Sequence, residues 1–263
     1  MNLRGKRIAL TGASAGIGRE LALQLARRGA RLALGARSSQ ALEEVATACR
    51  NEGGEAIVVS CDVAHAAECR AFVETAAGAF GGLDILVNNA GVTMVARFDE
   101  VQDLGVFEQI LRVNYLGAVY CTHAALPHLR ASRGLLVAIS SLSGLTGVPS
   151  RTAYSASKHA MQGFFDSLRV ELRGSGVDVL VVSPGFVSTQ MRERAFGPDG
   201  QKLGHDPRVG KRAMTTERCA ALIVRAIRSR RRELVMTAAG RVVRFANLLL
   251  PGLVDAFTAR VMK

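Results

Sequence analysis

The sequence predicts an α/β protein, a doubly wound parallel sheet of seven strands with helices on both faces. Short apolar runs rich in Val, Ile and Leu alternate along the chain with longer segments of helical periodicity. Strands that are apolar at consecutive positions are typical of a sheet buried on both faces. Because strand and helix alternate at this spacing, the connections are crossovers and neighbouring strands are parallel. The expected strands cover residues 7–11, 31–35, 56–60, 84–87, 135–140, 177–183 and 233–237.

A helix is expected directly after the first strand, over residues 17–28. Ile17, Leu21 and Leu25 recur at helical spacing, and Gly29 supplies a C-terminal stop. The chain has no internal repeat, low-complexity tract or flexible linker that would divide it. We therefore expect one domain, with residues 1–240 as its body and residues 241–263 as a basic amphipathic tail of the same domain.

Composition excludes several classes of protein. The chain of 263 residues is 49% hydrophobic and contains 27 glycines, which rules out a disordered or collagen-like protein. Its net charge of +12 raises the question of nucleic-acid binding, but ten basic and only three acidic residues lie within residues 217–263. With no Trp and three Tyr, the sequence lacks the interleaved aromatic residues of many nucleic-acid binders. No nucleic-acid partner is expected.

Cysteine and histidine usage argues against structural bridges and metals. The five cysteines are scattered and form no CxxC pair, and the five histidines form no ligand cluster, so neither disulfides nor a metal site is expected. No signal-peptide pattern follows Met1, and no segment reaches the ~18 apolar residues of a membrane span. A cytoplasmic protein is expected, with peripheral contact to a membrane left open.

A glycine-rich turn, TGASAGIG, occupies residues 11–18 after the first strand. Gly12 allows a tight turn, Gly16 allows close approach of the backbone, and Gly18 allows tight packing of the following helix. A pyrophosphate needs such a turn, with helix N–H groups and the helix dipole facing the anion. The spacing is GxxxGxG rather than GxGxxG, but its position between a strand and an apolar helix predicts a dinucleotide site.

The next two strand ends predict how the rest of the dinucleotide is bound. An acidic residue after the second strand would bind the 2′-hydroxyl of NAD, but here Ala36 and Arg37 take that place. Because a guanidinium suits a phosphate, Arg37 favours NADP(H), with NAD as the alternative. Arg37 could also be an ordinary solvated arginine. Asp62, which precedes Val63 after the third strand, is placed to meet the adenine or to cap the next helix, and these two roles are compatible.

Tyr154 and Lys158 lie four residues apart in the segment YSASK and share one face of a helix. A phenol with a pKa of about 10 is a poor proton shuttle at neutral pH. A cation at ~4 Å would be worth about 4 kcal/mol and would lower that pKa toward the working range. Ser141 follows the fifth strand, 13 positions before Tyr154, and Asn114 is a polar residue in an apolar helical stretch. This set of residues predicts acid–base chemistry.

In their order and spacing, these motifs resemble the short-chain dehydrogenase/reductase family over about residues 5–240. The resemblance implies a Rossmann-type, dinucleotide-binding catalytic domain over residues 1–240. It also implies an NADP(H)-dependent oxidoreductase that acts on a carbonyl or a secondary alcohol. The segments that carry it are TGASAGIG, Asp62, Asn88-Asn89-Ala90-Gly91, Asn114, Ser141, YSASK and Pro184-Gly185.

The resemblance also assigns roles. Tyr154 would be the general acid/base, and Ser141 would orient the substrate oxygen, with Ser140 a less well spaced alternative. Lys158 would bind the nicotinamide ribose and lower the phenol pKa, and Asn114 would hold a water that links Lys158 to bulk solvent. The family often has a basic residue at the position of Ala15 when it uses NADP, so here NADP depends on Arg37. Cofactor contacts are implied for Gly12, Ser14, Gly16, Ile17, Gly18, Arg37, Asp62, Val63, Asn89, Ala90, Gly91, Tyr154, Lys158, Pro184, Gly185, Val187 and Thr189.

The substrate side and the tail are less specified. The resemblance implies an apolar pocket, and hence a lipophilic ketone or alcohol, beneath a lid at about residues 190–214. The tail combines apolar residues with cations and is broken by Pro251-Gly252 into two short helices, so it either docks on an anionic membrane or packs over the pocket or a partner subunit. A homo-oligomer, dimer or tetramer, is expected from the family.

The alternative function is a catalytically weak, cofactor-sensing binding protein. The implied pocket residues are Val92, Met94, Val95, Leu145, Val148 and Phe186; the basic lid residues are Arg192, Arg194, Lys202, Arg208, Lys211 and Arg212; the tail cations are Arg241, Arg244, Arg260 and Lys263.

Overall fold

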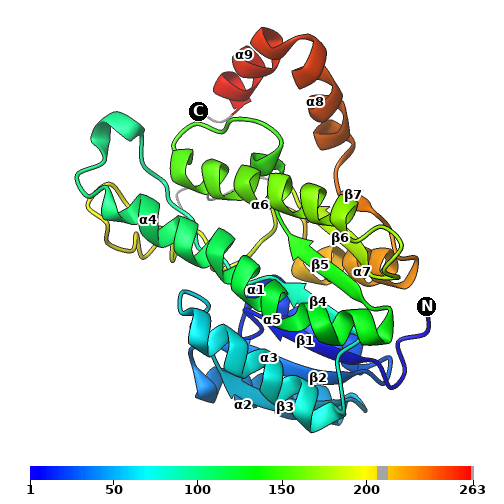
Figure 1. The fold of residues 1–263 in the computed structure, drawn as a ribbon. Helices are drawn as coiled ribbons and strands as arrows, with labels where there is room; N and C mark the ends of the chain where they lie inside the picture. Colours follow the sequence, from blue (N-terminus) through cyan, green and yellow to red (C-terminus); the bar gives the residue numbers. More distant parts are fainter. Residues whose placement is uncertain (206–212, 262–263) are drawn as a thin grey trace.

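The computed structural model describes residues 1–205 and 213–261, and it confirms the predicted parallel sheet of seven strands. The strand order is β3-β2-β1-β4-β5-β6-β7 (Figure 1). The winding direction reverses between β1 and β4, and ligands of open α/β sheets bind at the carboxyl ends of the strands beside such a reversal. The strands are β1 Arg7–Thr11, β2 Arg31–Ala36, β3 Glu55–Ser60, β4 Ile85–Asn88, β5 Leu135–Ile139, β6 Asp178–Ser183 and β7 Glu233–Val235.

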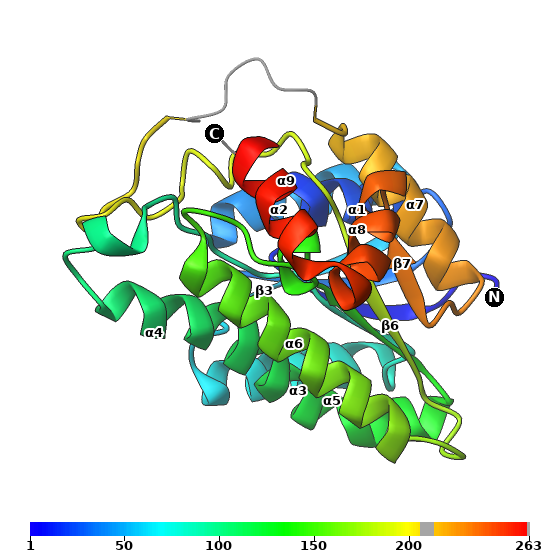
Figure 2. The ribbon, with the colours of Figure 1, turned by 90° about the horizontal axis from the view of Figure 1, so that it is seen from above.

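Helices cover both faces of the sheet (Figure 2). One apolar core lies between the sheet and helices α1, α2 and α7 and includes Leu21, Leu42 and Ile223. The other lies against α3, α5 and α6 and includes Phe72 and Phe165. The helices are α1 Gly16–Ala26, α2 Ser39–Asn51, α3 Ala66–Phe80, α4 Gly105–Leu111, α5 Gly117–Ser132, α6 Thr152–Glu171, α7 Thr216–Arg228, α8 Ala238–Leu249 and α9 Pro251–Val261, with short 3-10 turns η1 Phe98–Glu100 and η3 Leu142–Gly144.

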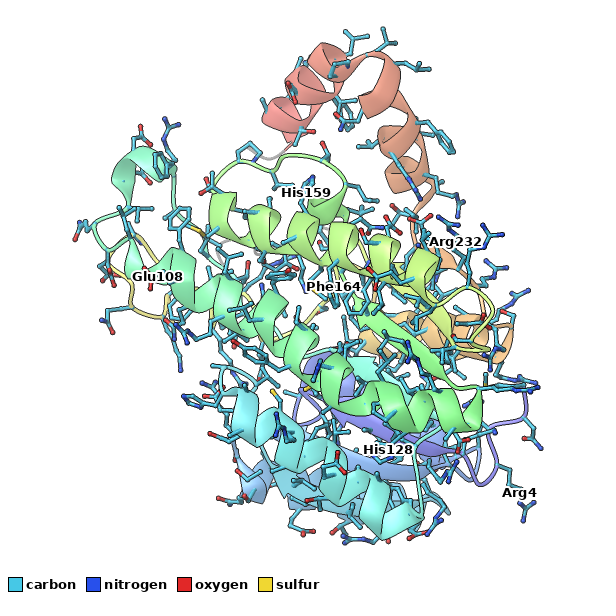
Figure 3. All side chains as sticks on the ribbon, viewed as in Figure 1. Arg4, Glu108, His128, His159, Phe164 and Arg232 are labelled. Carbon is cyan, nitrogen blue, oxygen red and sulfur yellow. The ribbon has the colours of Figure 1, made fainter. Side chains whose placement is uncertain are left out.

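A π-helical turn, η2 Arg112–Leu116, joins α4 to α5. The residues on either side of it keep right-handed helical dihedral angles, so the three segments form one continuous helix. Asn114 lies within this turn and is fully buried. Tyr115 packs edge-on against Phe164 of α6, with ring centroids 6.1 Å apart, which holds the two helices together (Phe164 is labelled in Figure 3). π turns are frequent at functional sites.

Helices α8 and α9 form a pair that projects beyond the rest of the domain (Figure 1). Thr237 caps α8 by accepting a hydrogen bond of 2.9 Å from the N–H of Gly240, so β7 ends two residues earlier than predicted. The predicted break is confirmed, since α9 begins at Pro251. No helix within the described ranges is both long and apolar enough to cross a membrane. The predicted tail cation Lys263 lies outside the described residues.

Candidate active site

The glycine-rich turn forms a cradle that side chains could not occupy. A Cβ on Gly12 would lie 2.8 Å from the Cα of Ala90, and one on Gly18 would lie 2.1 Å from the carbonyl oxygen of Gly12. Gly16 has a φ of +55°, a conformation that L side chains rarely adopt. Between these glycines, Ser14 is half-buried and Ile17 packs against the apolar core. The turn therefore exposes backbone rather than side chains at the start of α1.

Hydrogen bonds fix this turn to the end of β4. The hydroxyl of Thr11 accepts the N–H groups of Asn89 and Ala90 at 3.0 and 3.1 Å. The side-chain amide of Asn89 donates to the carbonyl oxygens of Thr11 and Gly12 at 2.9 and 3.1 Å. Asn88 faces the other way and donates to Thr122 of α5 at 3.0 Å. The two asparagines thus have different contacts, and only Asn89 shapes the cradle.

The first turn of α1 faces the same place. Its N-cap, Ala15, has no side chain that could accept the free N–H groups of the helix start. Such groups, together with the helix dipole, suit an anion. Thr189 lies directly beside this turn, since a Cβ on Gly16 would be 3.3 Å from the Cγ2 of Thr189. The structure therefore brings the predicted residues of the glycine turn and Thr189 together.

The outer end of the site contains Arg37 and Asp62. Arg37 is exposed just past β2, and its guanidinium forms no ion pair or hydrogen bond with the described residues. Asp62 accepts the N–H of Ala64 at 3.0 Å and thereby tightens the turn before α3, whose N-cap is His65. Asp62 therefore does not cap α3 directly, which corrects one of the two roles expected for it. Val63 is buried beside it.

The segment after β6 closes the site from a third side. The N–H of Leu142 donates to the carbonyl oxygen of Pro184 at 3.0 Å, which ties the ends of β5 and β6 together. Gly185 lies close to Thr237, since a Cβ there would be 3.1 Å from the Cγ2 of Thr237. Val187 is buried and forms an isolated parallel bridge with Met214.

Tyr154 and Ser141 meet at the carboxyl end of β5. Both belong to elements that pack closely, because a Cβ on Gly144 in η3 would lie 2.7 Å from the carbonyl oxygen of Lys158 in α6. Tyr154 is buried, and this burial raises the pKa of its phenol, while a hydrogen bond with Ser141 and the charge of Arg151 act in the opposite direction. The Ser141 hydroxyl also accepts the N–H of Ser143 at 3.1 Å. The phenol therefore holds its proton at neutral pH.

Lys158 is 3% exposed, and its Nζ donates to the carbonyl oxygen of Ile139 at 2.9 Å. Burial lowers the pKa of this ammonium from 10.5 to about 7. Nζ is 5.8 Å from the ring centroid of Tyr154, and Lys158 is not among the groups that shift the pKa of the phenol. The expected depression of the phenol pKa by Lys158 is therefore not present in this structure, where burial dominates both groups.

Asn114 is bound on three sides, which accounts for a fully buried amide. Its Oδ1 accepts the N–H of Val92 at 2.8 Å, and its Nδ2 donates to the carbonyl oxygen of Val92 at 2.9 Å and to the hydroxyl of Ser157 at 2.9 Å. A Cβ on Gly91 would lie 3.2 Å from Oδ1 of Asn114 and 3.8 Å from Nζ of Lys158. The structure thus brings together the end of β4, the π turn and α6.

Three residues of this region were not predicted. Ser157 links the π turn to α6, because it accepts from Asn114 and donates to the carbonyl oxygen of Tyr154 at 2.7 Å. Arg151 is buried at the start of α6, with its guanidinium carbon 6.0 Å from the ring centroid of Tyr154, and it donates to the hydroxyl of Thr93 at 2.8 Å. The only sequence signal for Ser157 and Arg151 was spacing, since both flank Tyr154 at three residues.

The substrate side is only partly as expected. Met94 is fully buried and pairs with Phe196, so it belongs to a small apolar core rather than to an open pocket surface. Phe186 is exposed and stacks with Arg192, whose guanidinium carbon is 5.0 Å from the ring centroid. The first part of the lid is anchored, because the N–H of Phe196 donates to the carbonyl oxygen of Thr93 at 2.9 Å. The predicted lid residues Arg208, Lys211 and Arg212 lie outside the described residues.

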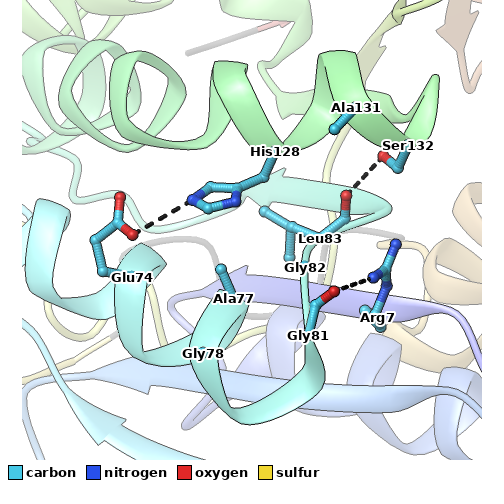
Figure 4. Close-up of a pocket in the computed structure, with 10 residues that line it drawn as sticks. All are labelled: Arg7, Glu74, Ala77, Gly78, Gly81, Gly82, Leu83, His128, Ala131 and Ser132. Carbon is cyan, nitrogen blue, oxygen red and sulfur yellow. Dashed lines mark hydrogen bonds and ion pairs between the residues drawn. The ribbon is translucent and has the colours of Figure 1, made fainter.

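A separate cavity of about 540 Å³ lies between α3 and α5 at the amino ends of the strands (Figure 4). Glu74 and His128 pair across it at 3.4 Å. Arg7, on its floor, donates to the carbonyl oxygen of Gly81 and forms an ion pair with Asp84 at 2.8 Å. No predicted site residue lines this cavity, so it is distinct from the candidate active site. In the described part of the chain, no group of three or more His, Cys, Asp or Glu residues could hold a metal ion.

Comparisons with known proteins agree with this geometry. Residues 6–198 match the family model described as short chain dehydrogenase. The chain is 37% identical over 261 residues to 11-beta-hydroxysteroid dehydrogenase 1A of Arabidopsis thaliana, a match that covers 97% of this chain and 74% of that protein. This match and the family model together show that the chain belongs to the short-chain dehydrogenase/reductase family, a family of oxidoreductases.

Solved structures support the same assignment. A short chain dehydrogenase/reductase from Burkholderia phymatum in complex with NAD has a TM-score of 0.83 and 28% identity, with 95% of this chain and 96% of that chain covered. An alcohol dehydrogenase from the archaeon Thermococcus sibiricus, complexed with 5-hydroxy-NADP, has a TM-score of 0.73 and 27% identity, with 87% and 94% covered. The Rossmann-type fold predicted from the sequence is therefore confirmed.

Proposed function

We propose that this protein is an NADP(H)-dependent oxidoreductase that transfers hydride between the nicotinamide and a carbonyl or secondary alcohol of a lipophilic substrate. The observation that carries the proposal is the convergence of Tyr154, Ser141, Lys158 and Asn114 at the carboxyl ends of β4 and β5. Hydrogen bonds to the rest of the protein hold the hydroxyl, ammonium and amide groups in place. Burial raises the pKa of the Tyr154 phenol and lowers the pKa of the Lys158 ammonium. Strongly shifted groups gathered in one place are typical of active sites.

The site fits a dinucleotide. The glycine cradle and the uncapped start of α1 suit a pyrophosphate, and Cβ atoms at Gly12 or Gly18 would close the cradle. Arg37 and Asp62 would hold the adenosine end, Asn89, Ala90 and Gly91 the middle, and Pro184, Gly185, Val187 and Thr189 the nicotinamide end. When bound, the cofactor supplies or accepts the hydride.

The protein's own residues would manage the proton. Because burial raises the pKa of Tyr154, the phenol is protonated at neutral pH and can donate to a carbonyl oxygen. Ser141, hydrogen-bonded to that phenol, would hold the same oxygen and stabilise its developing negative charge. These two roles need a donor and a proton source side by side, and the turn at η3 keeps the two hydroxyls together.

Lys158 and Asn114 would support Tyr154. The lowered pKa of Lys158, about 7, lets this group gain or lose a proton near neutral pH. Asn114 holds the end of β4 in place beside Lys158 through its two hydrogen bonds to Val92. In this position Asn114 would orient a water that returns a proton to Lys158, and Lys158 would also bind the nicotinamide ribose.

Arg37 supports the choice of NADP(H). Its guanidinium is exposed at the end of β2, where the adenosine ribose is bound in dinucleotide folds, and no acidic residue at position 36 opposes a 2′-phosphate. The two structural relatives were solved with NAD and with 5-hydroxy-NADP, so the fold accommodates both cofactors. Arg37 is the residue of this chain that would distinguish between them.

A lipophilic substrate is supported by the apolar residues around Tyr154 and by the relative named as a hydroxysteroid dehydrogenase. Val92, Leu145 and Val148 are partly exposed near the carboxyl ends of β4 and β5, and Phe186 is exposed beyond them. Apolar surface of this kind stabilises a bound hydrocarbon skeleton, while Tyr154 and Ser141 select one oxygen.

The direct test is NADPH oxidation by the full chain with a panel of steroid, fatty and 3-oxoacyl ketones, compared with Tyr154→Phe. The variant should lose at least ~10³-fold in kcat, because its ring keeps the packing but has no proton to donate, while the Kd for NADPH changes less than about twofold. A Tyr154→Phe protein that turns over normally would refute the mechanism. Cofactor binding without turnover of any ketone by the wild-type chain would instead favour the cofactor-sensing alternative.

The cofactor preference has its own test. Arg37→Asp should weaken NADPH binding by about 30- to 100-fold and NADH binding by less than about threefold, since only the 2′-phosphate meets the new carboxylate. Fluorescence titration with each cofactor measures both. If the affinities for NADPH and NADH fall by the same factor, then Arg37 does not bind the 2′-phosphate. Homo-oligomerisation stays a prediction, and light scattering on the purified protein tests it.

A further inference from the structure

The largest group of exposed apolar side chains in the described residues lies on α8 and α9. Their exposed fractions range from 55% to 80%. On α8 they recur three and four residues apart, on α9 the two are four apart, and one more lies at the junction, so each helix presents one apolar face. We call this set the tail face; it consists of Val242, Phe245, Leu249, Leu250, Leu253 and Phe257.

The two helices are attached to the domain along their other sides. Gly240 packs on Leu142, because a Cβ there would lie 2.5 Å from a methyl carbon of that residue. Asn247 donates to the carbonyl oxygen of Leu145 at 3.4 Å, and Arg244 forms an ion pair with Glu233. On α9, Val254 is buried while its neighbours are exposed, so α9 packs mainly against α8. The tail face is therefore turned to solvent, while the other sides of the helix pair lie against residues 142–145 and Glu233.

The charges around the tail face are mostly positive. Arg241 and Arg260 are exposed at the first turn of α8 and the last turn of α9, and Asp255 is the one acidic residue of these two helices. An apolar face with cations at its borders is the pattern of helices that lie on anionic lipid surfaces. A second copy fits less well, because a two-fold contact would bring together two surfaces that carry the same excess of positive charge.

We infer that the tail face docks on the surface of an anionic lipid bilayer, with α8 and α9 lying in the plane of the interface. The contacts of Gly240 and Asn247 with residues 142–145 then set the orientation of the domain. Since Ser141 directly precedes that segment, docking would turn the carboxyl end of the sheet toward the lipid. Docking of this kind is a binding event alone and does not depend on the proposed reaction.

Flotation of the full chain with vesicles tests it. Phosphatidylcholine vesicles that contain phosphatidylserine should bind at least about tenfold more protein than pure phosphatidylcholine vesicles, and added salt should reduce the difference. Phe245→Ser/Leu249→Ser should lose about tenfold or more of the binding. Phe98→Ser/Leu104→Ser is the matched control, since Phe98 and Leu104 are 62% and 64% exposed outside the tail and should lose less than about twofold.

The contribution of the tail arginines and the insertion of the tail face into lipid can be measured separately. Arg241→Gln/Arg260→Gln should weaken binding to the phosphatidylserine vesicles by about tenfold and leave binding to phosphatidylcholine unchanged. The chain has no tryptophan, so Phe245→Trp provides a single reporter, whose emission should shift to the blue with vesicles and be quenched by brominated lipid. Phe98→Trp should show neither change.

Each other outcome overturns the inference. Wild-type protein that fails to float with either vesicle shows that the tail face does not bind lipid. Equal losses in the tail and control variants show non-specific adsorption. If light scattering finds an oligomer that Phe245→Ser/Leu249→Ser dissociates, and the emission of the Phe245→Trp variant does not respond to lipid, then the tail face is a contact between copies of this chain. Unchanged thermal unfolding of the variants confirms that only surface chemistry has been altered.

Discussion

The carboxyl end of the sheet and the C-terminal helix pair depart from the usual distribution of side chains in opposite directions. In the first region, Asn114 and Lys158 place an amide and an ammonium in the protein interior. In the second, Phe245 and Leu249 place large apolar groups in solvent. Both arrangements are unusual for a folded domain, in which buried polar groups and large exposed apolar patches are the informative exceptions.

The two regions are suited to different kinds of ligand. The buried polar groups are satisfied by specific partners, such as Val92, Ser157 and Ile139, and so form a rigid site for one small molecule. The tail face has few partners of its own and suits a broad, non-directional surface. The hydrogen bonds of Asn114 also stabilise the fold, whereas the tail face makes few contacts with the rest of the chain. Matched substitutions in the two regions should therefore give very different results.

The largest contrast is expected between two glycines. Gly18→Ala places a Cβ 2.1 Å from the carbonyl oxygen of Gly12, so the free energy of unfolding should fall by more than about 3 kcal/mol and cofactor binding should be lost. Gly252→Ala in α9 meets no atom within 4 Å and should raise stability by up to about 1 kcal/mol, because alanine favours helix. Urea unfolding and NADPH titration measure both effects. Similar stability of the two variants would contradict the close-packed cradle.

The next contrast uses two asparagines. Asn114→Ala leaves both backbone groups of Val92 without their partner and removes one of the two hydrogen bonds of the Ser157 hydroxyl. It should cost about 2 to 3 kcal/mol of stability along with most of the activity. Asn247→Ala removes one long hydrogen bond to Leu145 and should cost less than about 0.5 kcal/mol. Chemical denaturation and kcat provide the readouts. If Asn114→Ala lowers the free energy of unfolding no more than Asn247→Ala does, then the hydrogen bonds of the Asn114 side chain do not stabilise the π turn.

The smallest effect concerns the charge of Lys158. Its pKa falls from 10.5 to about 7 on folding, so below pH 7 the folded protein carries a full penalty for a buried cation. Between pH 7 and 10.5 the unfolded chain binds more protons, so this group makes stability rise with pH, and above that range the penalty disappears. Lys158→Met should therefore stabilise the cofactor-free protein by about 2 kcal/mol at pH 7, after allowance for the lost bond to Ile139.

The gain from Lys158→Met should shrink steadily as the pH approaches about 10, and denaturation curves across this range measure it. A constant gain at every pH would show that the effect comes from packing rather than charge. Loss of stability at pH 7 would show that the ammonium is better solvated than its 3% exposure indicates.

Much of the fold could be predicted from local sequence. Strands buried on both faces require continuous apolar runs, and such runs mark β1, β4 and β5 to within a residue or two. The ends were less predictable where side chains compete with the sheet. Thr237 lies outside the last strand because its hydroxyl caps α8, and the hydrophobic pattern of residues 233–237 does not indicate this role.

The candidate site was predictable where spacing along one element decides geometry, as for Tyr154 and Lys158. It was not predictable where partners come from distant segments. Ser157 meets Asn114 across 43 residues of chain, and Arg151 meets Thr93 across 58. The pKa shifts of Tyr154 and Lys158 were not predictable either. Both shifts come from burial, and burial depends on how α6 packs in the folded domain.

The π turn around Asn114 has a consequence for how this helix tolerates insertions and deletions. A π turn holds one more residue than the α-helical turn it replaces, and each residue turns an α-helix by about 100°. The wide turn absorbs this extra residue, so deleting one residue between Arg112 and Leu116 would restore a regular helix and leave the facing of α5 nearly unchanged. A deletion in a regular part of the helix would instead rotate everything after it by that angle. Such a rotation would take Cys121 and Leu129 out of the core and His128 away from Glu74, so the segment around Asn114 is the place in this helix where one codon can be lost while α5 keeps its facing.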